Sequence, residues 1–180
     1  MDEQTLINEC LKGKSIAQQK LFEMFAPKMM GVCLRYMKYQ EEAEDVLQEG
    51  FVKVFNKLSA FESNGSLEGW IRRIMVNTAL DQLRKNAKFS TSYSLEDQEY
   101  KLEKTDFIVE NLMAEDLMKL INDMPDGYKV VFNMFAIEGY SHKEIAETLS
   151  ISENTSKSQY SRARAYLRER LEKENVERKR

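Results

Sequence analysis

The chain has 180 residues, of which 42% are hydrophobic and 32% charged, and its formal net charge is −3. These values predict a soluble globular protein of one large or two small domains. The sequence has no apolar run near the roughly 20 residues that cross a membrane. Two prolines and seven glycines, with few alternating apolar runs, predict an all-α fold.

The N-terminus and the cysteine content indicate the compartment. The first residues are acidic and amphipathic, which differs from a signal peptide. Two cysteines, Cys10 and Cys33, are too few for a disulfide framework, so we expect a cytoplasmic protein. With one histidine and two cysteines there is no zinc-ligand spacing, and we expect neither a metal nor another cofactor.

The first part of the chain predicts three helices. Residues 3–12 form a short helix closed by Gly13, and residues 15–37 form a long one that Pro27 should kink or split. A third helix should run over residues 41–58. The apolar residues that we expect to point inward from the long helix are Leu21, Phe22, Met24, Phe25, Met29, Val32 and Leu34.

A polar row follows one face of the third helix, opposite its apolar face. Its members are Asp45, Gln48, Glu49, Val52 and Asn56. A row of acids and amides is usually solvated surface. The valine in its middle is out of place on a purely solvated face.

A turn-rich loop over residues 59–69 precedes a fourth helix that should begin at Trp70. One side of this helix carries Trp70, Arg73, Asn77, Asp81, Arg84 and Lys88. A mid-helix Asn is commonly just exposed, but beside Trp, Arg and Lys it can also contact bases or backbone. The spacing alone leaves both interpretations open.

The organisation is that of two domains and a connector. We expect one domain over residues 1–88, a flexible acidic linker over 89–106, and a second domain over 107–180. The linker is polar and has no clear period.

Charge is strongly segregated along the chain. Residues 70–88 and 153–180 each carry a net charge of +4, whereas residues 94–116 carry −6. The overall charge argues against a nucleic-acid partner. Two basic modules separated by an acidic connector argue for one, and the distribution is the more informative observation.

The second domain ends in two helices joined by a tight turn. Ser141 and Glu144 form a capping box for a short helix, residues 150–152 break it, and Ser152 caps a longer helix. Before them, Pro125 should occupy the first position of a helix that Gly139 ends, with Val130, Val131, Phe132, Met134, Phe135 and Ile137 mostly in the hydrophobic core.

The long last helix has two distinct sides. Tyr160, Ala163, Leu167 and Leu171 should face inward. The outer side carries Asn154, Thr155, Ser158, Ser161, Arg162 and Ala165, with Lys157 and Arg164 on its flanks. This plan is typical of a helix-turn-helix whose second helix enters the DNA major groove. The alternative is a helical hairpin with a solvated face.

Two motifs in this order resemble a known family over nearly the whole chain. They are AEDVLQEGFVKVF (43–55) with WIRRIMVNTALDQLRK (70–85), and MPDGYKVVFNMFAIEGYSHKEIAETLSISENTSKSQYSRARAYLRERL (124–171). The chain resembles bacterial sigma factors of the extracytoplasmic-function group of the sigma-70 family. The resemblance implies a non-enzymatic subunit that binds core RNA polymerase and directs promoter-specific transcription initiation.

The resemblance also implies partners and contact residues. The partners are core RNA polymerase, through its β′ coiled coil and β subunit, and promoter DNA. The sequence leaves open whether an anti-sigma factor also binds, and the free protein should be monomeric. The implied polymerase contacts are Asp45, Gln48, Glu49 and Val52. The implied contacts with the −10 element are Phe61, Asn64, Trp70, Arg73, Asn77 and Arg84. Those with the −35 element are Ser141, Asn154, Thr155, Lys157, Ser158, Ser161 and Arg162.

The chain departs from the family pattern at the turn. Ser150 stands where the family has Gly, and Ser156 stands on the inner side of the last helix where an apolar β-branched residue is usual. We expect a positive φ at the first and a core-facing hydroxyl at the second, each costing about 1 kcal/mol. Gln159 and Ser161 also depart from the pattern, so the preferred promoter cannot be carried over.

Three other classes compete with the sigma-factor interpretation. A stand-alone helix-turn-helix regulator would dimerise on a palindrome, but it leaves the loop and the basic helix at 59–88 unexplained. An enzyme is disfavoured because the sequence shows no catalytic set, and His142 should lie on the outside of the capping turn. A helical scaffold protein leaves the charge segregation unexplained.

Overall fold

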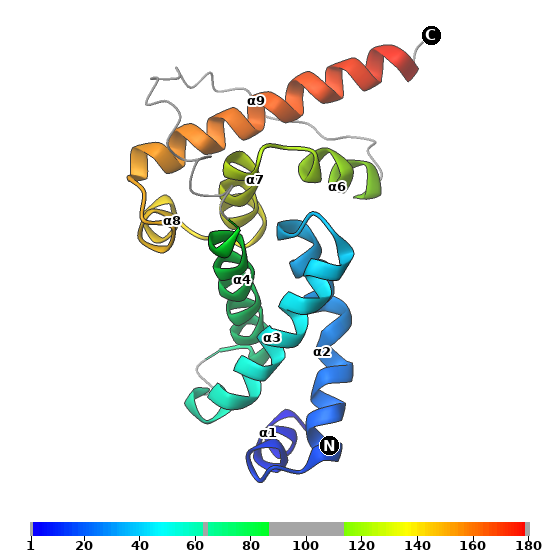
Figure 1. The fold of residues 1–180 in the computed structure, drawn as a ribbon, viewed down its shortest axis with the longest axis vertical. Helices are drawn as coiled ribbons and strands as arrows, with labels where there is room; N and C mark the ends of the chain where they lie inside the picture. The colour runs from blue at the N-terminus through cyan, green and yellow to red at the C-terminus, as the bar shows by residue number, and fades with distance from the viewer. Residues whose placement is uncertain (1, 63–64, 87–113, 179–180) are drawn as a thin grey trace. The chain divides into compact units, whose positions relative to one another are not determined.

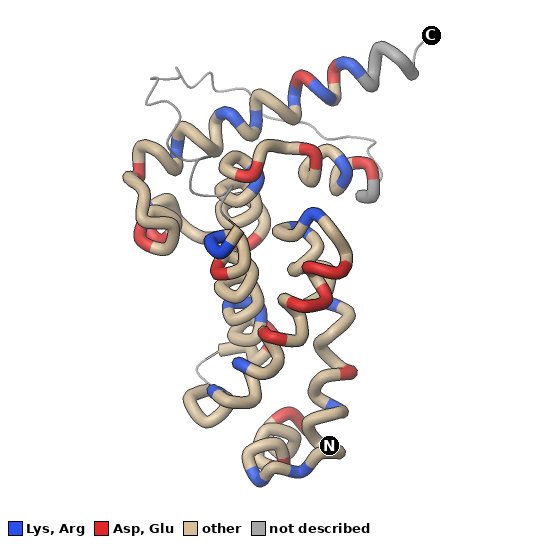
Figure 2. The backbone as a smooth tube through the Cα atoms, in the orientation of Figure 1, with Lys and Arg blue, Asp and Glu red and all other residues tan. Residues whose placement is uncertain are grey.

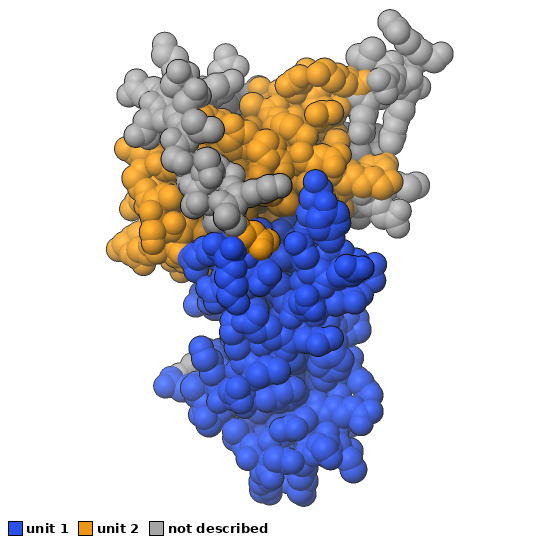
Figure 3. Space-filling view, in the orientation of Figure 1, with its two compact units in different colours: residues 1–85 blue, residues 86–180 orange. Residues whose placement is uncertain are grey.

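The computed structural model describes residues 2–62, 65–86 and 114–178 (Figure 1). Within these ranges every regular element is a helix, as predicted. The chain divides into two compact units, Met1–Lys85 and Asn86–Arg180 (Figure 3). Among the described helices none is long and apolar enough to cross a membrane. The predicted linker at 89–106 lies outside the described residues.

Unit 1 is a small helical bundle. Its elements are α1 (Glu3–Leu11), α2 (Ser15–Tyr36), α3 (Gln40–Lys57), the 3-10 turn η1 (Leu58–Ala60) and α4 (Leu67–Lys85). Helices α2, α3 and α4 each pack against the other two, and α1 packs on α2. The long helices therefore form one scaffold on which the polar row of α3 and the basic side of α4 are mounted.

Both ends of α1 have recognisable capping chemistry, and α2 continues through its proline. The Asp2 carboxylate accepts a hydrogen bond of 2.7 Å from the Thr5 backbone N–H, which caps α1. Gly13 closes that helix with a φ of +74°, as predicted. Helix α2 has 22 residues and continues through Pro27 without being split there. Proline removes one backbone hydrogen bond, and the packed bundle tolerates that loss.

The inner face of α2 is narrower than the sequence pattern suggested. Leu21 and Met29 are fully buried, as expected. Phe22 and Met24, which were also expected inside, are 37% and 49% exposed. Helices α1, α3 and α4 pack against α2 but cover only part of its surface, so an apolar stripe this wide extends beyond the covered face. The Phe22 ring still packs against Phe51, with 4.6 Å between the two ring centroids.

Helices α3 and α4 approach each other closely at Gly50. A Cβ atom added there would lie 2.3 Å from the Met75 sulfur and 2.9 Å from its terminal methyl carbon. Met75 is fully buried. The absence of a side chain at Gly50 is therefore what lets Met75 fill the space between the two helices.

Unit 2 contains the helix-turn-helix. Its described elements are α6 (Ala114–Asn122), α7 (Asp126–Phe132), the π-helical turn η2 (Asn133–Ile137), α8 (His142–Leu149) and α9 (Glu153–Arg178). Helix α9 packs against α6, α7 and α8. Its inward side chains Ala163, Leu167 and Leu171 are buried, as predicted. Helix α9 thus crosses and closes the hydrophobic core of this unit.

The segment before the helix-turn-helix differs from prediction in two details. Pro125 is the residue that precedes α7, rather than its first helical position. After Phe132 the helix widens into the π turn η2, in which the Glu138 N–H donates to the Asn133 carbonyl oxygen at 2.9 Å. The wider turn changes the angular spacing of its side chains, and Ile137, its last residue, is 37% exposed rather than buried. Gly139 then ends the segment at a φ of +78°.

Candidate nucleic-acid and polymerase interfaces

The polar row of α3 lies on the surface, but its members differ in their surroundings. Asp45 and Gln48 are exposed, and Val52 is 58% exposed. Glu49 instead pairs within unit 1, with Lys53 at 2.9 Å and with Lys85 of α4 at 3.9 Å. The acidic segments of α3 stand out in Figure 2. The row is thus an exposed apolar side chain among polar ones, with Glu49 oriented by lysines of the same unit.

Lys53 connects the two helices electrostatically. Besides Glu49, its ammonium lies 3.5 Å from a carboxylate oxygen of Asp81 on α4. Asp81 in turn pairs with Arg84 at 3.0 Å. These groups are partly exposed, so each pair contributes little to stability. Their effect is on the charge that each helix face presents.

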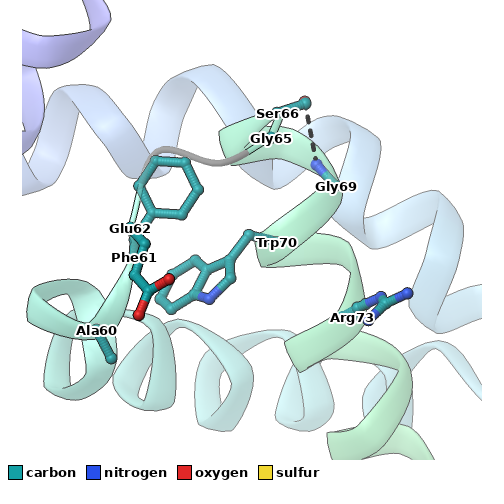
Figure 4. Close-up of a pocket in the computed structure, with 8 residues that line it drawn as sticks. All are labelled: Ala60, Phe61, Glu62, Gly65, Ser66, Gly69, Trp70 and Arg73. Carbon is teal, nitrogen blue, oxygen red and sulfur yellow. Dashed lines mark hydrogen bonds between the residues drawn. The ribbon is translucent and has the colours of Figure 1, made fainter.

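A hollow of about 470 Å³ lies where the loop after α3 meets the start of α4 (Figure 4). Its walls are Ala60, Phe61, Glu62, Gly65, Ser66, Gly69, Trp70 and Arg73. The Phe61 and Trp70 rings stand 5.5 Å apart at 52°. The indole extends from α4 toward Phe61, whereas the Arg73 guanidinium extends away from them. Two half-exposed aromatic rings beside an open space form a surface on which a planar group can stack.

Helix α4 begins three residues earlier than the sequence analysis predicted. Its first residue is Leu67, which is fully buried, and not Trp70. The Ser66 hydroxyl accepts a hydrogen bond from the Gly69 N–H at 3.3 Å, and its carbonyl accepts one from the Trp70 N–H at 3.0 Å. Trp70 therefore sits on a formed and capped helical turn, which fixes the direction of its indole.

The other members of the predicted row on α4 are on the surface. Arg73, Asn77 and Arg84 are exposed and recur at helical spacing from Trp70. The row therefore forms one continuous side of the helix. Asn64 and Lys88 lie outside the described residues.

The turn between α8 and α9 has the predicted chemistry. The Ser141 hydroxyl accepts from the Glu144 N–H at 3.2 Å, and the Glu144 carboxylate accepts from the Ser141 N–H at 2.8 Å. Ser150 has a φ of 56°, as expected, and both it and Ile151 donate backbone hydrogen bonds to the Ala146 carbonyl. The Ser152 hydroxyl accepts from the N–H of Thr155 at 2.9 Å, which starts α9.

The outer side of α9 is polar and solvent-accessible. Asn154 and Lys157 are exposed, and Thr155, Ser158, Ser161 and Arg162 are half-buried. Lys157 lies 3.8 Å from the Glu153 carboxylate, and the Ser158 hydroxyl donates to the Asn154 carbonyl at 2.8 Å. Basic segments recur along this helix in Figure 2. All but one of the residues assigned to the −35 element are therefore on one helix; the other, Ser141, is exposed at the start of α8.

His142 does not lie where the sequence predicted, and its contacts were not expected. His142 is half-buried rather than outside, and its ring stacks on Phe135 at 4.2 Å and 13°. Its Nδ1 lies 2.9 Å from the hydroxyl oxygen of Ser156, which is fully buried. The core-facing hydroxyl that we expected to be costly thus has a partner. Gln159, one turn further along, is also buried, at 2% exposed.

Two helical units, one with an aromatic hollow beside a basic helix and one with a helix-turn-helix, define a two-module DNA-binding protein. Residues 21–89 match the sigma-70 region 2 family and residues 114–167 match sigma-70 region 4. The chain therefore belongs to the sigma-70 family, in the extracytoplasmic-function (ECF) group of RNA polymerase sigma factors.

Curated relatives carry the same group name. The ECF sigma factor SigW of Bacillus subtilis is 26% identical over 179 residues, covering 92% of this chain and 94% of SigW. SigE of Mycolicibacterium smegmatis is 28% identical over 163 residues, covering 88% of this chain. The match spans 63% of the length of that SigE.

Two solved structures have a similar fold. The sigma factor RpoE in complex with the anti-sigma factor NepR from Bartonella quintana aligns with a TM-score of 0.55 and 22% identity, over 86% of this chain and 96% of that one. CnrH in complex with the cytosolic domain of CnrY aligns with a TM-score of 0.51 and 20% identity, over 94% of this chain and 97% of that one.

Proposed function

We propose that this sigma factor binds core RNA polymerase and directs transcription initiation at specific promoters. The observation that carries the proposal is the order of the two family matches, region 2 followed by region 4, within one chain. A stand-alone helix-turn-helix regulator accounts only for the second match. The role is one of recognition and carries no catalysis, and its place of action is the cytoplasm, where transcription occurs.

The polar row of α3 is the proposed contact with the β′ coiled coil of the polymerase. Asp45 and Gln48 offer a carboxylate and an amide to a basic and polar surface, and Val52 offers apolar area. An apolar centre within a polar rim is the usual composition of a protein interface. We propose Glu49 as a weaker contributor, because its carboxylate already lies beside Lys53 and Lys85.

The hollow beside Trp70 is the proposed receptor for an unstacked base of the −10 element. Extruding a base costs a few kcal/mol, and stacking on an aromatic side chain returns about 1–3 kcal/mol per base. Phe61 and Trp70 provide that stacking surface. Arg73, Asn77 and Arg84 extend along the same helix to contact the rest of the opened strand.

The outer side of α9 is the proposed contact surface for the −35 element, in the major groove.

We therefore assign promoter melting to a domain over residues 1–88 and upstream recognition to one over 107–180, joined by a linker over 89–106. The similarity to a sigma factor captured with NepR supports a further proposal, that an anti-sigma factor binds this chain as well.

The test is transcription in vitro with purified core polymerase on a panel of promoters from the host, each as a duplex and with a pre-melted −10 segment. The complete system should give promoter-specific transcripts, and neither component alone should do so. Trp70→Ala should reduce duplex transcription more than transcription from the pre-melted template. A chain that binds palindromic duplex as a dimer, and that leaves core polymerase unchanged, would refute the proposal in favour of a stand-alone regulator.

A further inference from the structure

A hydrogen bond joins the two helices of the helix-turn-helix from the inside. The Ser156 hydroxyl on α9 lies 2.9 Å from Nδ1 of His142, which is the first residue of α8. Ser156 is fully buried, so water does not compete for this contact. The two residues are fourteen positions apart in sequence and on different helices.

The imidazole of His142 is held on two sides. Its ring is stacked on Phe135 of η2 with a centroid separation of 4.2 Å, and it meets Tyr160 of α9 edge-on at 5.9 Å. Phe135 and Tyr160 also contact each other at 4.6 Å. A ring clamped in this way has little freedom to rotate, so its Nδ1 atom points in a fixed direction.

The protonation of His142 suits this contact. Burial lowers the pKa of His142 below its ordinary value, and the nearby Lys157 ammonium lowers it further, while Glu153 acts in the opposite sense. The imidazole is therefore neutral near pH 7. In the tautomer protonated at Nε2, its Nδ1 accepts the hydroxyl proton of Ser156.

The position of Ser156 gives this contact its consequence. It lies on the first turns of α9, directly between Thr155 and Lys157 and two residues before Ser158. Those three residues belong to the side that we assign to the −35 element. Side-chain hydrogen bonds to base edges weaken steeply with distance and angle, so a small rotation of these turns changes how bases are read.

We propose that His142 is a positioning residue, whose hydrogen bond to Ser156 fixes the orientation of the first turns of α9 and thereby sets base discrimination at the −35 element. This inference rests on the proposed function of α9. It also gives a reason for the unusual serine: a directional polar contact replaces the apolar side chain that usually packs at this position.

The test compares two substitutions of nearly identical shape. Ser156→Thr keeps the hydroxyl, whereas Ser156→Val replaces that hydroxyl with a methyl group. Any strain from the added bulk acts on both, so their difference reports the hydrogen bond alone. His142→Phe is the complementary variant, because it keeps a ring to stack on Phe135 and removes Nδ1.

Each full-length variant is combined with core polymerase and allowed to select duplexes from a library randomised over the −35 segment. Preference is then measured as the affinity ratio between the sequence that the wild type enriches and a scrambled one, with circular dichroism to confirm folding. We expect Ser156→Val and His142→Phe to lower this affinity ratio about 5- to 10-fold, and Ser156→Thr to keep it. The Ser156→Val/His142→Phe double variant should be no worse than either single one, since both remove the same contact.

The outcomes distinguish the positioning role of His142 from the proposed function of α9. A selective wild type with equal ratios for Thr and Val variants would overturn the positioning role and leave the proposed function intact. If the added bulk lowers the affinity ratio of both Ser156 variants, the result for His142→Phe is decisive. An unchanged affinity ratio for His142→Phe would then overturn the positioning role of His142. A wild type that shows no preference over the −35 segment would instead overturn the function assigned to α9.

Discussion

The exposed row of α3 can be tested by removing two side chains that have no large role in the fold. Gln48 is exposed and Val52 is 58% exposed. Substitutions at such positions usually change stability by no more than about 0.5 kcal/mol each. Gln48→Ala/Val52→Ala should therefore fold normally, with a thermal midpoint close to that of the wild type. Glu49 is a poorer target, because reversing its charge would repel Lys53 within the fold.

The expected loss of polymerase binding follows from the exposed area and from one polar contact. Burying a whole valine side chain contributes about 1.5 kcal/mol or slightly more, so the 58% of Val52 that is exposed corresponds to about 1 kcal/mol. A Gln48 hydrogen bond to a charged or polar partner adds about 1–2 kcal/mol. The sum of about 2–3 kcal/mol weakens binding by roughly 30- to 150-fold.

The assay titrates fluorescently labelled core polymerase with the wild type, the double variant and a control. Lys57→Ala is the matched control, since Lys57 is exposed at the end of the same helix and outside the row. The control should bind as the wild type does. Wild-type affinity of the double variant, with folding confirmed by circular dichroism, would show that α3 does not contact the polymerase through this row.

Five other substitutions have defined outcomes. Gly31→Ala, with open space around it, should raise the free energy of unfolding by about 0.5–1 kcal/mol, whereas the crowded Gly50→Ala should lower it by about 1–2 kcal/mol in denaturant titrations. Asn77→Ala should reduce transcription from a duplex promoter more than from a pre-melted one, and equal losses would leave Asn77 as plain surface. Arg162→Ala should weaken binding to the −35 element by about 1–3 kcal/mol if it reads a guanine, with a sequence-independent loss and a shallower salt slope if it contacts phosphate. Burial lowers the pKa of His142, so the unfolded chain binds a proton at a higher pH than the folded chain does. The free energy of unfolding should therefore fall as the pH drops through the ordinary pKa value of 6.5, and level off below the folded pKa. His142→Phe should remove that part of the dependence of the thermal midpoint on pH.

Local chemistry made much of the fold predictable. The capping box at Ser141 and the closure of α1 at Gly13 depend on residues within one turn of each other, whereas the positive φ at Ser150 was expected from the family resemblance. Such signals can be read directly from sequence. The start of α4 was missed because Gly65 and Gly69 suggested a loop, while the Ser66 cap and buried Leu67 between them begin a helix.

Features that depend on tertiary packing were not predictable. The π turn at η2 changes the angular spacing of side chains without any distinctive residue, so the expected inward position of Ile137 was wrong. The pairing of His142 with Ser156 joins different helices, and each residue alone suggested something else, an exposed ring and an unsatisfied hydroxyl. The ion pair of Glu49 with Lys85 was likewise not predictable, because Lys85 lies on another helix, whereas the pair with Lys53 has the i,i+4 spacing of a helix.

The contact at Gly50 has a consequence for how the two surfaces of unit 1 work together. Gly50 lies within the segment of α3 that carries Gln48 and Val52, and Met75 lies on α4 between Trp70 and Asn77. The close approach of α3 and α4 between the proposed polymerase contact and Trp70 thus depends on the Met75 side chain filling the space left by the missing side chain at Gly50. If α3 binds the polymerase and Trp70 receives a base, as proposed, then the packing of α3 against α4 links the position of the bound polymerase to the place where the strands open.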